Sequence, residues 1–353
     1  MKKWLKVALC ILLAVVLLVG GYVAYVFIDY HRLGDMTLTP EHNAGAAESG
    51  TVYTMISYNI GFGAYESDYG FFMDGGTESR AWSKERLTKN LTAISTFLQE
   101  QDADFYLLQE VDTGATRTYQ VDERAYFTEA LSGMSWVYCQ NYDSPYLMYP
   151  LLKPHGASHA GLMTFSTADI AAANRVELPI EGGFMKLLDL DRCYSVSRIP
   201  VSGGKELVLY NLHLSAYTSD GTIATEQLKL LLADMQAEYE SGNWCVAGGD
   251  FNKDLLGDSA AWFGEADQSY SWAQPIPAET FAGVDVSLAA PLDENDPVPS
   301  CRNADGPYHE GQYVLTVDGF LTTPNVTVSQ ATVLDTGFAW SDHNPVKMTF
   351  TLS

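Results

Sequence analysis

Basic residues are scarce in this sequence. Its 353 residues include 20 lysines and arginines against 44 aspartates and glutamates, so the formal net charge is −24 at pH 7. A field of this sign repels polyanions, whereas a surface dedicated to duplex nucleic acid is normally basic. The charge therefore disfavours duplex nucleic acid as a partner without excluding it, because bound metal ions can offset the charge locally.

Cysteines are also few, and internal repeats and long low-complexity tracts are absent. The five cysteines have no spacing typical of a zinc site. Four of them, Cys139, Cys193, Cys245 and Cys301, follow the N-terminal region, and an even number in an exported domain permits disulfides without predicting a pairing. Hydrophobic residues make up 47% of the chain, which is enough for a sizeable core and excludes a disordered protein.

Charge is missing altogether from residues 7–28. This run of 22 residues follows Lys2, Lys3 and Lys6, and a helix needs roughly 20 apolar residues to cross a bilayer. A cleaved signal peptide is the alternative, but its apolar part spans only about 7–15 residues and ends at a small-residue cleavage site. We expect residues 1–30 to be a short cytoplasmic stub and an uncleaved, single-pass signal anchor in the cell membrane. The lysines would stay in the cytoplasm and the rest of the chain would be extracellular.

The remainder predicts a tether and one α/β domain. Residues 31–50 are polar and rich in small residues, which is typical of a tether. In residues 51–353, apolar residues at helical spacing predict helices around residues 87–98 and 228–239. Short apolar runs predict strands at residues 52–59, 105–109, 136–140, 161–165, 194–197, 207–214, 244–247, 313–321, 326–333 and 346–351. This order favours mixed sheets over a simple doubly wound sheet, with long loops in residues 259–311.

Polar residues interrupt the apolar strands at their ends, where sites are commonly built. The set comprises Asn59, Glu110, His213, Asp250, Asn252, Asp318, Asp342 and His343. Hard oxygen ligands with few histidines suit Mg²⁺, or else Mn²⁺ or Ca²⁺. A histidine beside an aspartate suits proton transfer. Each residue alone is more often a cap, a turn or a structural residue, but together they fit metal-assisted attack of water on phosphorus.

The ordered set resembles the endonuclease/exonuclease/phosphatase superfamily, which includes deoxyribonuclease-I-like nucleases, sphingomyelinases and inositol polyphosphate 5-phosphatases. The resemblance runs from Val52 to the C-terminus. Its most specific pieces are Gly249-Asp250-Phe251-Asn252 and Ser341-Asp342-His343-x-Pro345-Val346, followed by Leu108-Gln109-Glu110 and Asn211-x-His213-Leu214. The resemblance implies a four-layer sandwich, in which two mixed β-sheets pack face to face with helices outside.

The resemblance also implies a role for each polar residue. Glu110 would be the main metal ligand, with Asn59 and Asp342 near the ion. Asp250 would orient or deprotonate the attacking water, and Asn252 would hold the water or a phosphate oxygen. His343, oriented by Asp318, would contact the phosphate and transfer a proton. His213 would stabilise the phosphate or the leaving oxygen.

Further contacts to substrate are suggested only by position. Arg117 and Asn141 stand in expected loops near the motif strands, and a cationic side chain such as Arg117 would suit a phosphate, although a surface ion pair is the simpler interpretation. Tyr142, Tyr146 and Tyr149 could line a pocket or touch lipid headgroups, and packing is the simpler interpretation here too.

The sequence thus predicts a metal-dependent phosphoesterase that hydrolyses a phosphodiester or phosphomonoester at the outer face of the membrane, on a lipid or small-molecule substrate. One alternative is an extracellular nuclease. Another, of a different class, is a non-catalytic surface binding module with the same fold. The substrate, the number of metal ions and the oligomeric state stay open.

Overall fold

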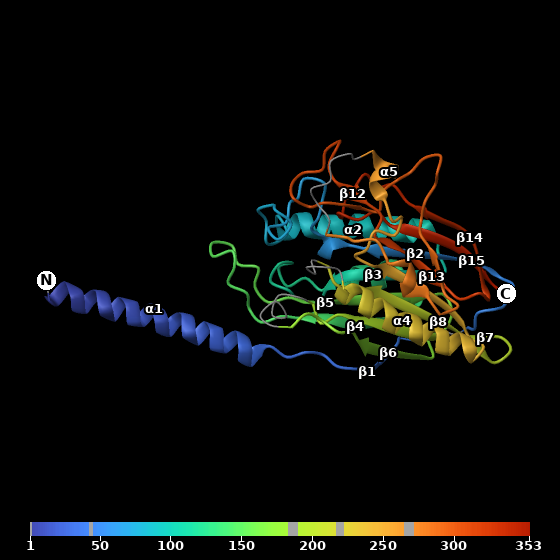
Figure 1. The fold of residues 1–353 in the computed structure, drawn as a ribbon, viewed down its shortest axis with the longest axis horizontal. Coiled ribbons are helices and arrows are strands. Elements are labelled where there is room, and N and C mark those ends of the chain that lie inside the picture. Colours follow the sequence, from blue (N-terminus) through green and yellow to red (C-terminus); the bar gives the residue numbers. More distant parts are fainter. Residues whose placement is uncertain (1, 42–44, 183–189, 217–221, 265–271) are drawn as a thin grey trace.

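The computed structural model describes residues 2–41, 45–182, 190–216, 222–264 and 272–353. A long N-terminal helix leads into a domain in which two β-sheets lie face to face (Figure 1). The helices are α1 (Lys2–Asp29), α2 (Lys84–Gln101), α3 (Arg124–Ala130), α4 (Thr222–Glu240) and α5 (Ser259–Phe263), with short 3-10 helices η1 (Gly61–Gly63) and η3 (Ala278–Phe281).

Both large sheets are mixed. In the described residues, the first sheet has the order β1 (Met36–Leu38), β6 (Ala172–Glu177), β7 (Cys193–Val201), β8 (Lys205–His213), β9 (Trp244–Asp250), β13 (Asp318–Thr322) and β10 (Ser287–Ala289). The second has the order β14 (Val326–Val333), β15 (Val346–Leu352), β2 (Val52–Asn59), β3 (Phe105–Asp112), β5 (His159–Ser166) and β4 (Ser135–Asp143). The pairs β8–β9 and β2–β3 are parallel. A small separate sheet joins β11 (Cys301–Arg302) to β12 (Val314–Leu315).

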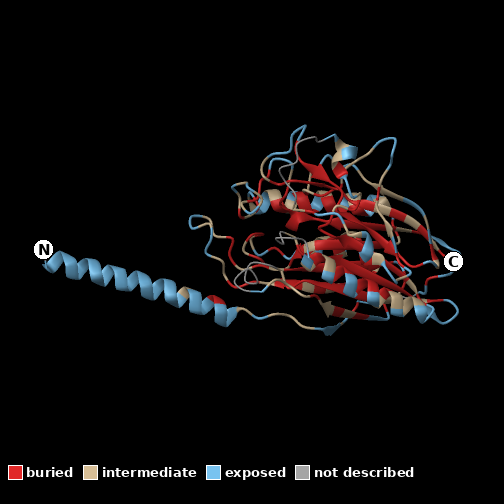
Figure 2. Cartoon of the chain, viewed as in Figure 1, coloured by how far each residue is buried: buried red, intermediate tan, exposed pale blue. Residues whose placement is uncertain are grey.

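The core has three apolar layers, which explains why the central strands are apolar on both faces. Along β3, Phe105 and Leu107 face the other sheet, whereas Tyr106 and Leu108 face α2. Leu231 of α4 packs in the same way on the outer face of the first sheet. Figure 2 shows these buried layers inside the domain and a largely exposed α1. The predicted four-layer sandwich is therefore confirmed.

Several expected elements differ in extent. The predicted strand at residues 313–321 is two strands, β12 and β13, which belong to different sheets. Short elements, namely α5, η3, β10 and β11, interrupt the loops expected in residues 259–311. Strands β1 and β6 were not predicted. β1 is an edge strand of three residues, and its neighbour β6 buries Ala173 and Arg175, so neither strand shows an alternation of large apolar residues.

The segment expected to be a tether is attached to the domain at several points. Met36–Leu38 pair with β6 at the edge of the first sheet. The backbone of Glu41 exchanges hydrogen bonds with that of Trp136, and Ala47 is buried with its N–H on the carbonyl of Pro200. Residues 36–41 and 45–47 therefore lie against the two sheets, and the chain passes from α1 onto the domain within a few residues.

Candidate active site

The polar residues meet because several strands end or begin at one edge of the two sheets. Asn59 and Gln109 are opposite each other on β2 and β3, and His213 and Asp250 are opposite each other at the ends of β8 and β9. Asp318 begins β13 opposite Asp250. Asp342 and His343 lie a few residues before β15, which is antiparallel to β2. The predicted set therefore comes from both sheets and converges at one end of the sandwich.

Glu110 reaches this end through an irregularity in β3. The pairing of β3 with β5 shifts between Leu108 and Val111, and Glu110 has a φ of 58°. A positive φ is uncommon for a residue with a side chain, and residues held in that conformation cluster at functional sites. The bulge gives Glu110 a position that the regular alternation of the strand would not provide. Its Oε1 accepts a hydrogen bond from Nδ2 of Asn59 at 3.1 Å.

Asp250 is the centre of the polar network. Its Oδ2 accepts from Nδ2 of Asn59 at 3.1 Å, and its Oδ1 accepts from the backbone N–H of Asn252 at 2.8 Å. Nε2 of His213 lies 3.5 Å from Oδ2, and Nε2 of His343 lies 3.7 Å from the same oxygen. Asp250 is thus placed between two imidazoles and tied to the opposite sheet.

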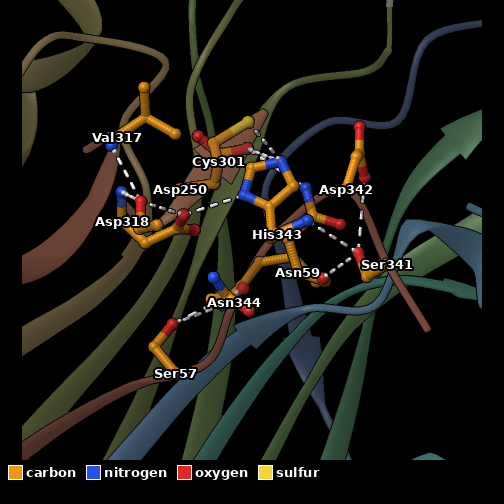
Figure 3. A network of polar contacts seen from close by, with 12 residues as sticks. Ser57, Asn59, Asp250, Cys301, Val317, Asp318, Ser341, Asp342, His343 and Asn344 are labelled. Carbon is orange, nitrogen blue, oxygen red and sulfur yellow. Dashed lines mark hydrogen bonds and ion pairs between the residues drawn. The ribbon is translucent and has the colours of Figure 1, made fainter. Parts of the chain in front are cut away.

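His343 is held by a chain of hydrogen bonds (Figure 3). Its Nδ1 donates to Oδ2 of Asp318 at 2.8 Å, and the hydroxyl of Ser300 donates to the same oxygen at 2.7 Å. Nε2 of His343 lies 3.6 Å from the sulfur of Cys301. Because Nδ1 is fixed by Asp318, the ring presents Nε2 towards Asp250 and the cavity.

Burial and charge determine the protonation of these groups. Burial raises the pKa of Glu110, Asp250 and Asp342 above the ordinary range of a carboxyl group. Burial lowers the pKa of His213, which favours a neutral ring. Burial also acts to lower the pKa of His343, but the carboxylate of Asp318 outweighs it and holds that pKa well above its usual value. The site thus contains one imidazole, that of His343, whose protonated form is favoured, and one, that of His213, whose neutral form is favoured.

These donors fit a divalent cation. Glu110 and Asp342 are half-buried carboxylates that repel each other, and removing such groups from water without a neutralising charge is unfavourable. Asp250, Asp318 and His343 also offer ligand atoms within 4.8 Å of one another. Carboxylate and amide oxygens are the ligands of Mg²⁺, Mn²⁺ and Ca²⁺.

A cavity of about 170 Å³ opens onto these residues. Its polar wall includes Glu110, His213, Asp250, Asn252, Asp342 and His343, and its apolar wall includes Phe62, Tyr65, Phe71, Tyr142 and Trp272. Arg117, Arg192 and Arg302 also line it. A pocket with a few convergent polar groups and an aromatic wall suits a small phosphate ester bearing an apolar part.

Arg117 and Asn141 are both buried, although their surroundings differ from those expected. Arg117 is no surface residue: it makes a bidentate pair with buried Asp112, at 3.0 and 2.9 Å, and lies over the ring of Phe62. Asn141 lies within β4 and not in a loop. Within the described part of the chain its amide has no hydrogen-bond partner, and its neighbour Tyr142 lines the cavity.

Some residues of the site had no signal in the sequence. Ser300 and Cys301 lie in the region where long loops were expected, and only the tertiary fold brings Ser300 to Asp318 and Cys301 to His343. Ser341 stands in the terminal motif and had no role assigned. Its hydroxyl donates to the backbone carbonyl of Asn59 at 2.8 Å and accepts from the N–H of His343 at 3.1 Å.

Comparison with solved structures gives the same fold. An endonuclease/exonuclease/phosphatase from Beutenbergia cavernae has a TM-score of 0.57 and 18% identity, over 86% of this chain and 72% of its own. Truncated TDP2 of Caenorhabditis elegans has a TM-score of 0.51 and 15% identity, over 86% and 98%. ANGEL2, a 2′,3′-cyclic phosphatase, has a TM-score of 0.54 and 16% identity, over 90% and 99%.

These identities show the fold alone, and a comparison with curated proteins finds no match. The model of the Endonuclease/Exonuclease/phosphatase family, by contrast, matches residues 56–343, which include every residue of the predicted set. The chain belongs to the endonuclease/exonuclease/phosphatase family.

Proposed function

We propose that this protein is a membrane-anchored, divalent-metal-dependent phosphoesterase that hydrolyses a phosphodiester or phosphomonoester on the outer side of the membrane. The observation that carries the proposal is the convergence of three carboxylates, Glu110, Asp250 and Asp342, with the imidazoles of His213 and His343 on one cavity. The pKa of His213 is lowered and that of His343, which is held by buried Asp318, is raised. Family membership supports hydrolysis of a phosphate ester and leaves the substrate open.

Glu110 and Asp342 are the residues that would hold the ion, with Mg²⁺ as the first choice. A divalent cation there would neutralise charge on the phosphoryl oxygens. Asn59, which the sequence placed among the metal residues, donates its amide hydrogens to Glu110 and Asp250. It therefore orients both carboxylates, and this fixes the ligand Glu110 relative to the base Asp250.

In the proposed reaction, Asp250 accepts a proton from the attacking water, since its raised pKa suits a general base. The water oxygen bonds to phosphorus, and the bond from phosphorus to the ester oxygen breaks. His343, held protonated by Asp318, is placed to donate a hydrogen bond or a proton to the phosphate group. Neutral His213 stabilises the phosphate or the leaving oxygen. Asn252 lines the cavity, and its Nδ2 donates to the carbonyl of Leu214, so its Oδ1 is the atom that would hold the water.

Arg117 and Asn141 are proposed to contact the substrate. Arg117 lines the cavity even though Asp112 holds its guanidinium. The amide of Asn141, without a partner in the described residues, would gain hydrogen bonds from a phosphate.

The membrane anchor is supported by α1. Among the described residues, α1 is the one helix long and apolar enough to cross a membrane, with a mean hydropathy of 2.8 over its best window. A signal sequence would meet the same criterion. The lysines before the run favour the cytoplasm, which would place residues 51–353 outside the cell.

The test uses the full chain in detergent micelles, with Mg²⁺, Mn²⁺ or Ca²⁺ and a panel of phospholipid vesicles, sphingomyelin, bis(4-nitrophenyl) phosphate and plasmid DNA. We expect hydrolysis that stops with EDTA and in Asp250→Ala, and that persists in the exposed control Asp296→Ala. Preference for plasmid with steep salt dependence would favour the nuclease alternative. Absence of both hydrolysis and metal binding would favour the non-catalytic module.

A further inference from the structure

The segment between β4 and β5, residues 144–158, presents apolar side chains to solvent. Tyr149 is 67% exposed, Leu151 79% and Leu152 fully exposed. The segment contains no aspartate or glutamate, although the chain has 44 of them. Exposed apolar groups gathered on one loop, without acidic neighbours, are typical of a surface that contacts another apolar phase.

This loop is bonded to α1. The hydroxyl of Tyr22 donates to the carbonyl of Tyr146 at 3.1 Å and accepts from the N–H of Met148 at 2.9 Å. The hydroxyl of Tyr25 accepts from the N–H of Tyr146 at 3.0 Å. Figure 1 shows the loop, in green, reaching past the rest of the domain on the side of α1. Strand β4 continues this contact, since Nε2 of His31 lies 3.0 Å from Oδ2 of Asp143.

The position of these contacts along α1 sets the depth of the loop. Tyr22 lies six residues before the end of the uncharged run at Ile28, and a helix rises 1.5 Å per residue, so the contact lies about 9 Å inside that end. A loop bonded at this level cannot stay in water if α1 spans the bilayer. Tyrosines are enriched near the interface between membrane and water, where the ring lies in the apolar region and the hydroxyl reaches a polar partner.

We propose that loop residues Met148, Tyr149, Leu151 and Leu152 insert into the outer leaflet of the bilayer that α1 crosses, and that the cavity thereby opens at the level of the lipid headgroups. The occupant of this surface is the bilayer itself. The insertion rests on the proposed anchor, and the substrate it implies, a phosphate ester within a lipid headgroup, rests on the proposed function.

The inserted loop shares a wall with the cavity. The ring of Tyr149 lies 5.7 Å from that of Phe72, which in turn lies 4.7 Å from that of Phe71. Phe71 and His155, which lies within the loop, both line the cavity, as does the exposed Met73. One aromatic cluster therefore joins the membrane-contacting loop to the mouth of the active site, so a lipid headgroup could enter without leaving its leaflet.

The first test measures depth directly. Spin labels are placed through Leu152→Cys, and through Val52→Cys at the opposite end of the domain, in full-length Cys10→Ala protein in lipid nanodiscs. The other native thiols are buried. We expect the label at position 152 to be accessible to oxygen and protected from a water-soluble nickel chelate, and the label at position 52 to show the reverse. Equal nickel accessibility at both positions would overturn the insertion.

The second test separates insertion from catalysis. In proteoliposomes, Leu151→Asp/Leu152→Asp should lower hydrolysis of vesicle phospholipid about tenfold or more, because two apolar groups lose their lipid contact. It should leave hydrolysis of bis(4-nitrophenyl) phosphate unchanged, and Leu230→Asp on α4 should change neither. Equal loss on both substrates, or no loss on either, would contradict the headgroup arrangement. A wild type inactive on both would refute the proposed function, and the spin labels would still decide the insertion.

Discussion

Nδ1 of His343 lies 2.8 Å from Oδ2 of Asp318, and both side chains are buried. The two residues come from different sheets, since Asp318 begins β13 and His343 precedes β15. This contact fixes the ring orientation and raises the pKa of the imidazole against the effect of burial. It also leaves Oδ1 of Asp318 without a hydrogen-bond partner in the described residues.

Asp318→Asn should therefore impair catalysis more than folding. The amide keeps the size of the side chain but removes the negative charge that orients His343 and favours its protonated form. We therefore expect kcat to fall about 10²–10⁴-fold. Steady-state kinetics with thermal unfolding would check this, with exposed Asp296→Asn as the matched control. An active Asp318→Asn variant would show that the carboxylate only supports packing.

Mg²⁺ should stabilise the protein through Glu110 and Asp342. Binding to the folded state alone, at a concentration about 100 times the Kd, would add about 2.7 kcal/mol to the free energy of unfolding. We expect Glu110→Gln and Asp342→Asn to lose most of the Mg²⁺-dependent rise in Tm. Glu100→Gln, at an exposed position of α2, should retain it. Equal rises in all variants would place the ion elsewhere.

The pair of Arg117 and Asp112 allows a structural role to be separated from a substrate role. Arg117→Met alone leaves the buried Asp112 carboxylate unpaired, and we expect a loss of about 3–5 kcal/mol in the free energy of unfolding. Arg117→Met/Asp112→Asn should recover most of that loss. If Arg117 contacts the phosphate, the double variant stays poorly active although it is folded. If activity returns together with stability in the double variant, Arg117 has only the structural role of pairing with Asp112 and does not contact the substrate.

His155 should make the protein less stable in mild acid. Burial, together with the nearby charge of Arg117, lowers its pKa to about 3, while the unfolded chain has a pKa of about 6.5. Between these values the unfolded state binds a proton that the folded state does not, so stability falls as pH falls. From pH 6.5 to 5 the expected loss is about 2 kcal/mol.

Denaturant unfolding of wild type and His155→Gln across this pH range would isolate that contribution, since the other titrating groups are shared. The difference between the two proteins should shrink towards low pH. Parallel curves would show that the pKa of His155 is the same in the folded and unfolded states, so that its protonation does not affect stability.

Buried, continuous strands and their polar ends were visible in the sequence, whereas features that depend on distant pairing were not. The run at 52–59 is β2 with the same bounds, because it is rich in β-branched and aromatic residues and ends at Asn59. Glu110 looked like the end of a strand, yet β3 continues to Asp112 through a bulge that only its partner β5 reveals. The burial of Arg117 and the docking of residues 36–41 likewise depend on tertiary contacts that leave no periodic pattern.

Asn211 links the two sheets that share the site. Its buried amide donates to the carbonyls of Leu108 and Met163 and accepts from Nε2 of Gln109, so a residue of β8 is hydrogen-bonded across the interface to β3 and β5. Sliding one sheet over the other by a single residue would break these bonds and separate Glu110 from Asp250. Catalytic activity therefore depends on the relative position of the two sheets. Activity should be lost in any partly unfolded state in which the sheets shift, even if the secondary structure is retained.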